Sequence, residues 1–227
     1  MEISLSNVEK HYVRKGKGGT IREIPVLSKI DFSLKSGKII RIIGESGCGK
    51  STLMNMICGM LPPSSGSIVY NGRSIYDLGD DDLSLLRNRK FGIVPQRSVA
   101  VGSLSVEDNI RLPFLYVSSE TSELKERTEK LLQYLNISGL ADSFPNELSG
   151  GEMRRVCIAR SLINEPEFIF ADEPTNDLDK DNMELVLSLL RKKADEGVGV
   201  MIVSHDSSVG DYADETYRVA DGQVVRI

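Results

Sequence analysis

The sequence predicts an α/β fold, and three features support this prediction. A β-branched, apolar run at residues 38–43 leads into a glycine-rich loop, and an apolar helix pattern follows at residues 53–57. Two more apolar runs, at residues 167–173 and 199–206, flank an amphipathic helix pattern at residues 181–196. We therefore expect an open α/β sheet at the core, with polar residues at the ends of its strands.

An antiparallel β layer is expected before the core strand. Residues 3–6, 25–27 and 30–34 alternate in polarity, with glycine turns between them. The β pattern resumes at residues 67–72, after a proline-glycine turn. Tyr12 is expected at a strand end, where its ring suits stacking on a purine, although a lone tyrosine more often serves packing.

Residues from about 97 to 163 have a helical character and lie between core strands, which predicts an inserted helical subdomain. Leucines recur there at helical spacing, at positions 124, 131, 132 and 135. The run Ser149-Gly150-Gly151-Glu152 opens a further helix and so forms a helix N-terminus suited to an anion. Taken alone, this run is only a good N-cap. The chain ends in a predicted hairpin with an Asp-Gly turn at residues 221–222.

The glycine-rich loop joins a strand to a helix N-terminus and fits the pattern G-x-x-x-x-G-K-S. Its glycines let main-chain N–H groups turn inward, and the helix dipole is positive at the same end. Lys50 is expected to reach the β- and γ-phosphates of a nucleotide, and the Ser51 hydroxyl to ligate Mg²⁺. The residues expected to bind the phosphates are Gly44, Glu45, Ser46, Gly47, Cys48, Gly49, Lys50, Ser51 and Thr52.

Polar side chains stand where other core strands end. Asp172 and Glu173 close one apolar run. One carboxylate is expected to hold Mg²⁺ through water, and its neighbour to polarise an attacking water. The alternative is that both acids are solvated at the strand's exit. Gln96 and His205 end two further strands, at the edge where ligands bind in an open α/β sheet.

Composition bounds the class of protein. The chain has 227 residues, enough for one domain, and its 40% hydrophobic and 27% charged content is typical of a folded globular protein. The net charge of −5 predicts no general attraction to nucleic acid, and the basic run at residues 14–17 is expected to be a solvated turn. Three cysteines without a C-x-x-C pair predict neither a disulfide framework nor a zinc site. No apolar run approaches the ~18 residues that cross a bilayer, so a cytosolic location is expected.

Taken together, these motifs resemble the nucleotide-binding subunit of ATP-binding-cassette (ABC) transporters over nearly the whole chain. Six motifs stand in the family's order: the adenine-stacking aromatic Tyr12, the Walker A loop at residues 44–52, the Q-loop Gln96, the signature at residues 148–152, the Walker B strand at residues 168–173, and the switch His205. The resemblance implies a single cassette with a P-loop NTPase (RecA-like) core at residues 1–96 and 164–227.

The resemblance also implies roles for these residues. Two copies form a head-to-tail dimer, with ATP between the Walker A loop of one copy and the signature helix of the other. Glu173 is then the general base, and His205 contacts the γ-phosphate. Ser51, Gln96 and Asp172 hold Mg²⁺ directly or through water. Hydrolysis moves attached membrane subunits, so the protein is peripheral on the inner face of the membrane, through its permease.

The segments at residues 105–113 and 173–179 look like those of the macrolide-export and lipoprotein-release branch. Three positions depart from the usual pattern: Glu152 replaces glutamine, Asn176-Asp177 replaces a small pair, and Cys48 replaces serine. Beside a helix N-terminus the Cys48 thiol is expected to be reactive.

Other hypotheses for the function are a non-transporting ATPase that regulates a membrane partner, as in cell division, a soluble ABC protein on ribosomes or DNA, and a phosphate-loop kinase. The last has no use for the signature helix.

Overall fold

A computed structural model describes residues 1–15 and 21–227. A six-stranded sheet lies at its centre, in the order β10-β9-β3-β8-β7-β6, and all of its neighbours are parallel except β9 and β10. Its strands are β3 (Ile39–Ile43), β6 (Phe91–Val94), β7 (Phe168–Asp172), β8 (Gly199–Val203), β9 (Glu215–Ala220) and β10 (Gln223–Arg226). The predicted α/β core is confirmed, as is the closing hairpin, whose turn is Asp221-Gly222.

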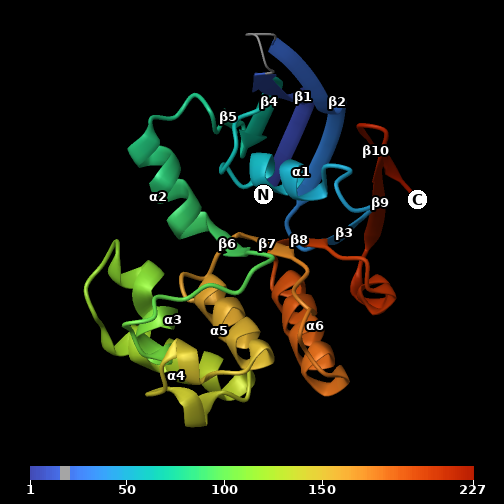
Figure 1. Ribbon diagram of the computed structural model, residues 1–227. Helices are drawn as coiled ribbons and strands as arrows, with labels where there is room; N and C mark the ends of the chain where they lie inside the picture. The colour runs from blue at the N-terminus through green and yellow to red at the C-terminus, as the bar shows by residue number, and fades with distance from the viewer. Residues whose placement is uncertain (16–20) are drawn as a thin grey trace.

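An antiparallel sheet in the order β2-β1-β4-β5 forms a second layer, at the top of Figure 1. Its strands are β1 (Glu2–Lys15), β2 (Ile21–Lys35), β4 (Ser65–Tyr70) and β5 (Arg73–Ser74). The predicted layer is therefore present. Two details differ: residues 25–27 and 30–34 belong to one strand, and Tyr12 lies inside β1 and not at a strand end. The basic run begins within β1, and its Gly16 and Lys17 lie outside the described residues.

Six helices complete the described part of the chain: α1 (Lys50–Ile57), α2 (Asp80–Lys90), α3 (Val106–Leu115), α4 (Ser122–Tyr134), α5 (Gly150–Leu162) and α6 (Lys180–Asp195). Figure 1 shows α3, α4 and α5 together on the side of the central sheet away from the antiparallel layer, with α6 beside α5. Short 3-10 segments lie at Ser138–Leu140, Pro145–Glu147 and Ser207–Tyr212. Within the described ranges, no helix combines the length and the apolar character needed to cross a lipid bilayer.

The central sheet separates two hydrophobic cores, because successive strand residues face opposite sides. Phe168 and Phe170 of β7 pack with the antiparallel layer and α1. Their neighbours Ile169 and Ala171 pack with α5 and α6. All four are fully buried. The strands that carry the predicted site are thus fixed from both faces.

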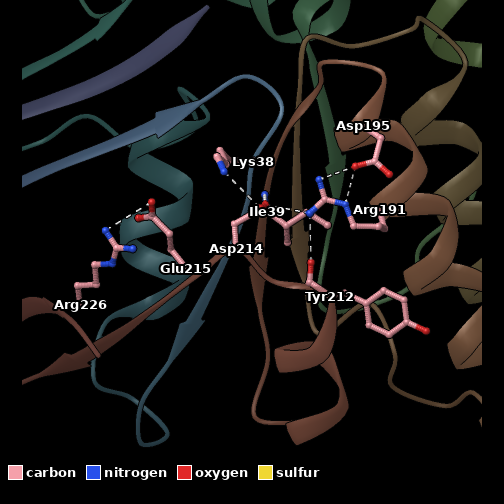
Figure 2. Close-up of polar contacts among 8 residues, drawn as sticks. All are labelled: Lys38, Ile39, Arg191, Asp195, Tyr212, Asp214, Glu215 and Arg226. Carbon is pink, nitrogen blue, oxygen red and sulfur yellow. Dashed lines mark hydrogen bonds and ion pairs between the residues drawn. The ribbon is translucent and has the colours of Figure 1, made fainter.

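Asp214, just before β9, connects the strand that leads into the glycine-rich loop to α6 (Figure 2). Its carboxylate accepts hydrogen bonds from the Ile39 N–H at 2.7 Å and from Arg191 Nη1 at 2.9 Å. Arg191 also forms an ion pair with Asp195 at 2.9 Å, and Lys38 Nζ lies 3.4 Å from Asp214 Oδ1. Partial burial raises the pKa of Asp214, but the Ile39 N–H and Arg191 outweigh it, so that this pKa lies below its usual range.

Candidate functional site

The glycine-rich loop follows β3 and opens α1. Gly49 caps α1 with φ 110°, and Gly44 has φ 151°. A side chain at Gly44 would place its Cβ 2.4 Å from the Val219 carbonyl oxygen, so that only glycine fits. Lys50 Nζ donates to the carbonyls of Gly44 and Glu45, both at 2.8 Å. The ammonium therefore lies over the loop, at the end of the helix where the dipole is positive.

The acidic pair at the end of β7 is buried and not solvated. Asp172 and Glu173 are 5% and 7% exposed, which excludes the alternative considered for them. Ser51 Oγ donates to Asp172 Oδ2 at 2.8 Å. Burial, together with the neighbouring charge of Glu173, raises the pKa of Asp172, although the Ser51 hydroxyl and Lys50 act in the opposite direction. The structure thus brings the loop and the acidic pair into contact.

Glu173 is held in place by residues at the end of β8. Its N–H donates to the Val203 carbonyl at 2.8 Å, Ser204 Oγ donates to its Oε2 at 2.9 Å, and His205 Nδ1 lies 2.8 Å from its Oε1. Ser204 is fully buried and was not among the sequence-predicted residues. Its position next to His205 at a strand end is the signal that points to it.

One cleft of about 550 Å³ brings the predicted loop and strand-end residues together. Gln96 after β6, Asp172 and Glu173 at the end of β7, and His205 after β8 all line it, so each comes from the carboxyl edge of a parallel strand. Its other lining residues are Tyr12, Val26, Gly44, Ser46, Gly47, Gly49, Lys50, Ser51, Thr52 and Asn176. Tyr12 is 44% exposed, and its hydroxyl lies 3.5 Å from Thr52 Oγ1.

The signature residues line a different hollow, of about 510 Å³, together with Asp177. Ser149 caps α5: its Oγ accepts from the Glu152 N–H at 3.3 Å, and Glu152 Oε2 accepts from the Ser149 N–H at 2.8 Å. The hydroxyl and then the N–H of Ser149 lower the pKa of Glu152. No described residue lines both hollows. The chain thus carries two helix N-termini suited to anions, and it does not bring them together.

A divalent cation fits the first cleft. The Ser51 hydroxyl and the Asp172 carboxylate lie 2.8 Å apart, and the Gln96 amide lines the same space. Hydroxyl, carboxylate and amide oxygens are the ligands that Mg²⁺ prefers. The three residues therefore form a donor set for this ion beside the loop that suits the phosphates.

Comparison with known proteins agrees with this geometry. The family model described as "ABC transporter" matches residues 27–176. A macrolide export ATP-binding/permease protein of Mannheimia succiniciproducens is 40% identical over 89% of this chain, which spans 31% of that relative's length. An uncharacterized ABC transporter ATP-binding protein of Methanocaldococcus jannaschii is 33% identical, with 99% of this chain and 98% of the relative covered.

Among solved structures, a dimeric ATP-binding cassette bound to ADP and phosphate superimposes with a TM-score of 0.90. It is 33% identical, and the match covers 98% of this chain and 96% of that one. The chain therefore belongs to the ABC transporter family and is an ABC ATPase cassette. The resemblance that the six motifs indicate is confirmed.

Proposed function

We propose that this chain is the ATP-binding and ATP-hydrolysing subunit of an ABC transporter, a single cassette over residues 1–227 with its helical subdomain at about 97–163. One observation supports this most: a single cleft gathers the loop lysine, the buried acidic pair, Gln96 and His205 from four separate chain segments. The chemistry of the γ-phosphate needs these groups within reach of one another.

Each part of the glycine-rich loop has a task in binding. The N–H groups of Gly44 to Thr52 surround the phosphates, and Lys50 neutralises the β- and γ-phosphate charge. Tyr12, whose ring is half exposed beside Thr52, stacks on the adenine. Ser51, Asp172 and Gln96 would hold Mg²⁺, which stabilises charge on the phosphate oxygens when it is bound.

Glu173 is the proposed general base. It accepts a proton from the water that attacks the γ-phosphorus, while the bond from that phosphorus to the β-phosphate oxygen breaks and ADP and phosphate form. Ser204 and His205 orient its two carboxylate oxygens. His205, whose side chain is 76% exposed, is placed to contact the γ-phosphate as well.

The active species is a dimer in this proposal. Ser149, Gly150, Gly151 and Glu152 face the γ-phosphate bound to a second copy, which gives the second anion-binding helix end its function. Support comes from the separation of the two hollows in one chain and from the dimeric cassette that this chain resembles. ATP closes the dimer and hydrolysis opens it.

The partner is an integral membrane permease, which places the chain on the inner face of the cell membrane. The substrate is a macrolide, a peptide or a lipoprotein-type molecule that is exported or released. The macrolide-export relative supports this branch. The net charge of −5 agrees with a partner other than nucleic acid.

The test is to express tagged Glu173→Gln protein in its native cell, to solubilise membranes gently with ATP present, and to identify what co-purifies. We expect a permease with few transmembrane helices and a large outer domain. A six-helix permease would move the chain to another transporter class. Recovery in the soluble fraction with ribosomes or DNA would overturn the transport proposal, and recovery with a membrane regulator of cell-wall hydrolases would favour the cell-division alternative.

A further inference from the structure

The segment that carries Gln96 has little main-chain support. β6 is the edge strand of the central sheet, and its pairing with β7 ends at Val94. Across the part of the chain that the structure describes, the main-chain groups of residues 95–100 form no hydrogen bond with another main-chain group. Side chains must therefore fix this segment in place.

The side chains that do so come from α5, the helix that the signature opens. Arg154 donates from Nη1 to the Pro95 carbonyl at 2.7 Å and from Nη2 to the Gln96 carbonyl at 2.6 Å. Arg160, two turns further along α5, donates to the Val99 carbonyl at 2.7 Å. The Gln96 side chain is left exposed and lines the cleft. The main chain of this segment is thus attached to α5, while its amide faces the site.

Arg154 is a charged residue in a buried position. It is 1% exposed, and among the described residues its hydrogen-bond partners are two carbonyls and no carboxylate. A buried charge without an ion-pair partner costs free energy that an apolar residue of the same size would avoid. The planar guanidinium, however, offers two parallel donors, which match two consecutive carbonyls in a way that a single ammonium does not.

We propose that Arg154 is a positioning residue of the hydrolytic site: its guanidinium fastens the carbonyls of Pro95 and Gln96 to α5 and so fixes where the Gln96 amide lies. This inference rests on the proposed function. Any rotation of α5 relative to the central sheet displaces Gln96 with it, because no main-chain hydrogen bond holds the segment to the sheet. Gln96 is thereby coupled to the same helix whose N-terminus carries Ser149.

The test compares Arg154→Met, which keeps length but has no donor, with Arg154→Lys, which can reach one carbonyl. Arg160→Met is the matched control on the same helix and segment. We expect Arg154→Met to lower kcat by about tenfold or more, while KM and the ATP affinity in EDTA change little, since a displaced group affects the reaction more than binding. Arg154→Lys should recover part of kcat, and Arg160→Met should keep it.

A double variant shows whether Arg154 acts through Gln96. When Gln96 is already replaced by alanine, adding Arg154→Met should lower kcat by less than about a further twofold, because both changes remove the same interaction. Losses that multiply, or an ATP affinity in EDTA that falls as far as kcat, would overturn the inference and leave Arg154 a structural residue.

Limited proteolysis gives a readout that does not depend on turnover. Trypsin should cleave after the exposed Arg97 faster in Arg154→Met than in the wild type, because the segment is no longer fastened to α5. An unchanged rate of cleavage after Arg97 would overturn the inference. A wild-type protein without ATPase activity would contradict the proposed function instead, so the two failures are distinguishable.

Discussion

Glu173 adopts a main-chain conformation that is rare for a residue with a side chain, with φ 49°. Such a left-handed conformation costs on the order of 1–3 kcal/mol and persists where surrounding contacts enforce it. Here the contacts are the Val203 carbonyl, Ser204 and His205. In this conformation Glu173 leaves the line of β7 and lines the cleft, as Asp172 does.

Glu173→Gln should preserve ATP binding and nearly abolish turnover. Glutamine has the same length and can still bond Ser204, but it cannot accept a proton from water. We expect kcat to fall by roughly 10²- to 10⁴-fold, measured as phosphate release. Lys50→Ala is the contrasting variant, since it should weaken ATP binding itself. Full turnover by Glu173→Gln would remove Glu173 as the base.

Cys48 gives a second prediction at the loop. Its side chain is half buried, and a Cβ at Gly44 would lie 2.7 Å from its Sγ, so there is little room beside the loop for an added group. Alkylation should therefore block ATP hydrolysis, and ATP should protect. Cys48→Ser is the control, because it should stay active and resist the reagent while Cys58 and Cys157 remain buried. Full activity after complete modification of Cys48 would contradict this prediction.

Asp214 links β3, β9 and α6, and its contribution to stability should depend on pH. Its pKa is lower in the folded than in the unfolded chain, so its stabilisation is present above the unfolded pKa and is lost as pH falls through the folded pKa. Asp214→Asn keeps an oxygen for the Ile39 N–H but loses the charge that faces Arg191. We expect a loss of about 1–2 kcal/mol in the free energy of unfolding at pH 7.

Urea denaturation of the wild type and of Asp214→Asn at pH 7 and near pH 3 measures this. The difference in unfolding free energy should shrink at the acidic pH, where the wild-type carboxyl approaches protonation. A difference that is equal at both pH values would show that the charge is not responsible. Asp195→Asn is a suitable control. In this variant Arg191 still has its ion pair with Asp214, and the Asp195 side chain is 66% exposed, so little stability should be lost.

The elements were predicted best where periodicity is uninterrupted. The core strands and α6 follow their patterns closely, whereas β1 and β2 are expected in short pieces. β1 and β2 shift register at several points, and Asn7 and Lys29 have positive φ, so the alternation breaks although the strands continue. The same irregularities explain why Tyr12 was placed at a strand end.

The site was predictable where a residue type coincides with the loop motif, as at Lys50, or with a strand end, as at Glu173 and His205. Contacts between distant segments were not predictable. Ser204 and Arg154 are buried polar residues whose partners lie 31 and 58 or more positions away, and no local pattern identifies these partners. Whether two copies complete one site is likewise a property of the assembly, which a single chain does not display.

The two helix ends suited to anions, at the start of α1 and of α5, line separate hollows in one chain. In the proposed mechanism they bind the same nucleotide only when two copies face each other. The most direct measurement is the mass of Glu173→Gln in solution, by light scattering after gel filtration, with and without ATP and Mg²⁺. We predict a species of 25.1 kDa without nucleotide and of twice that mass with it. A single-copy mass at saturating ATP would contradict the shared site.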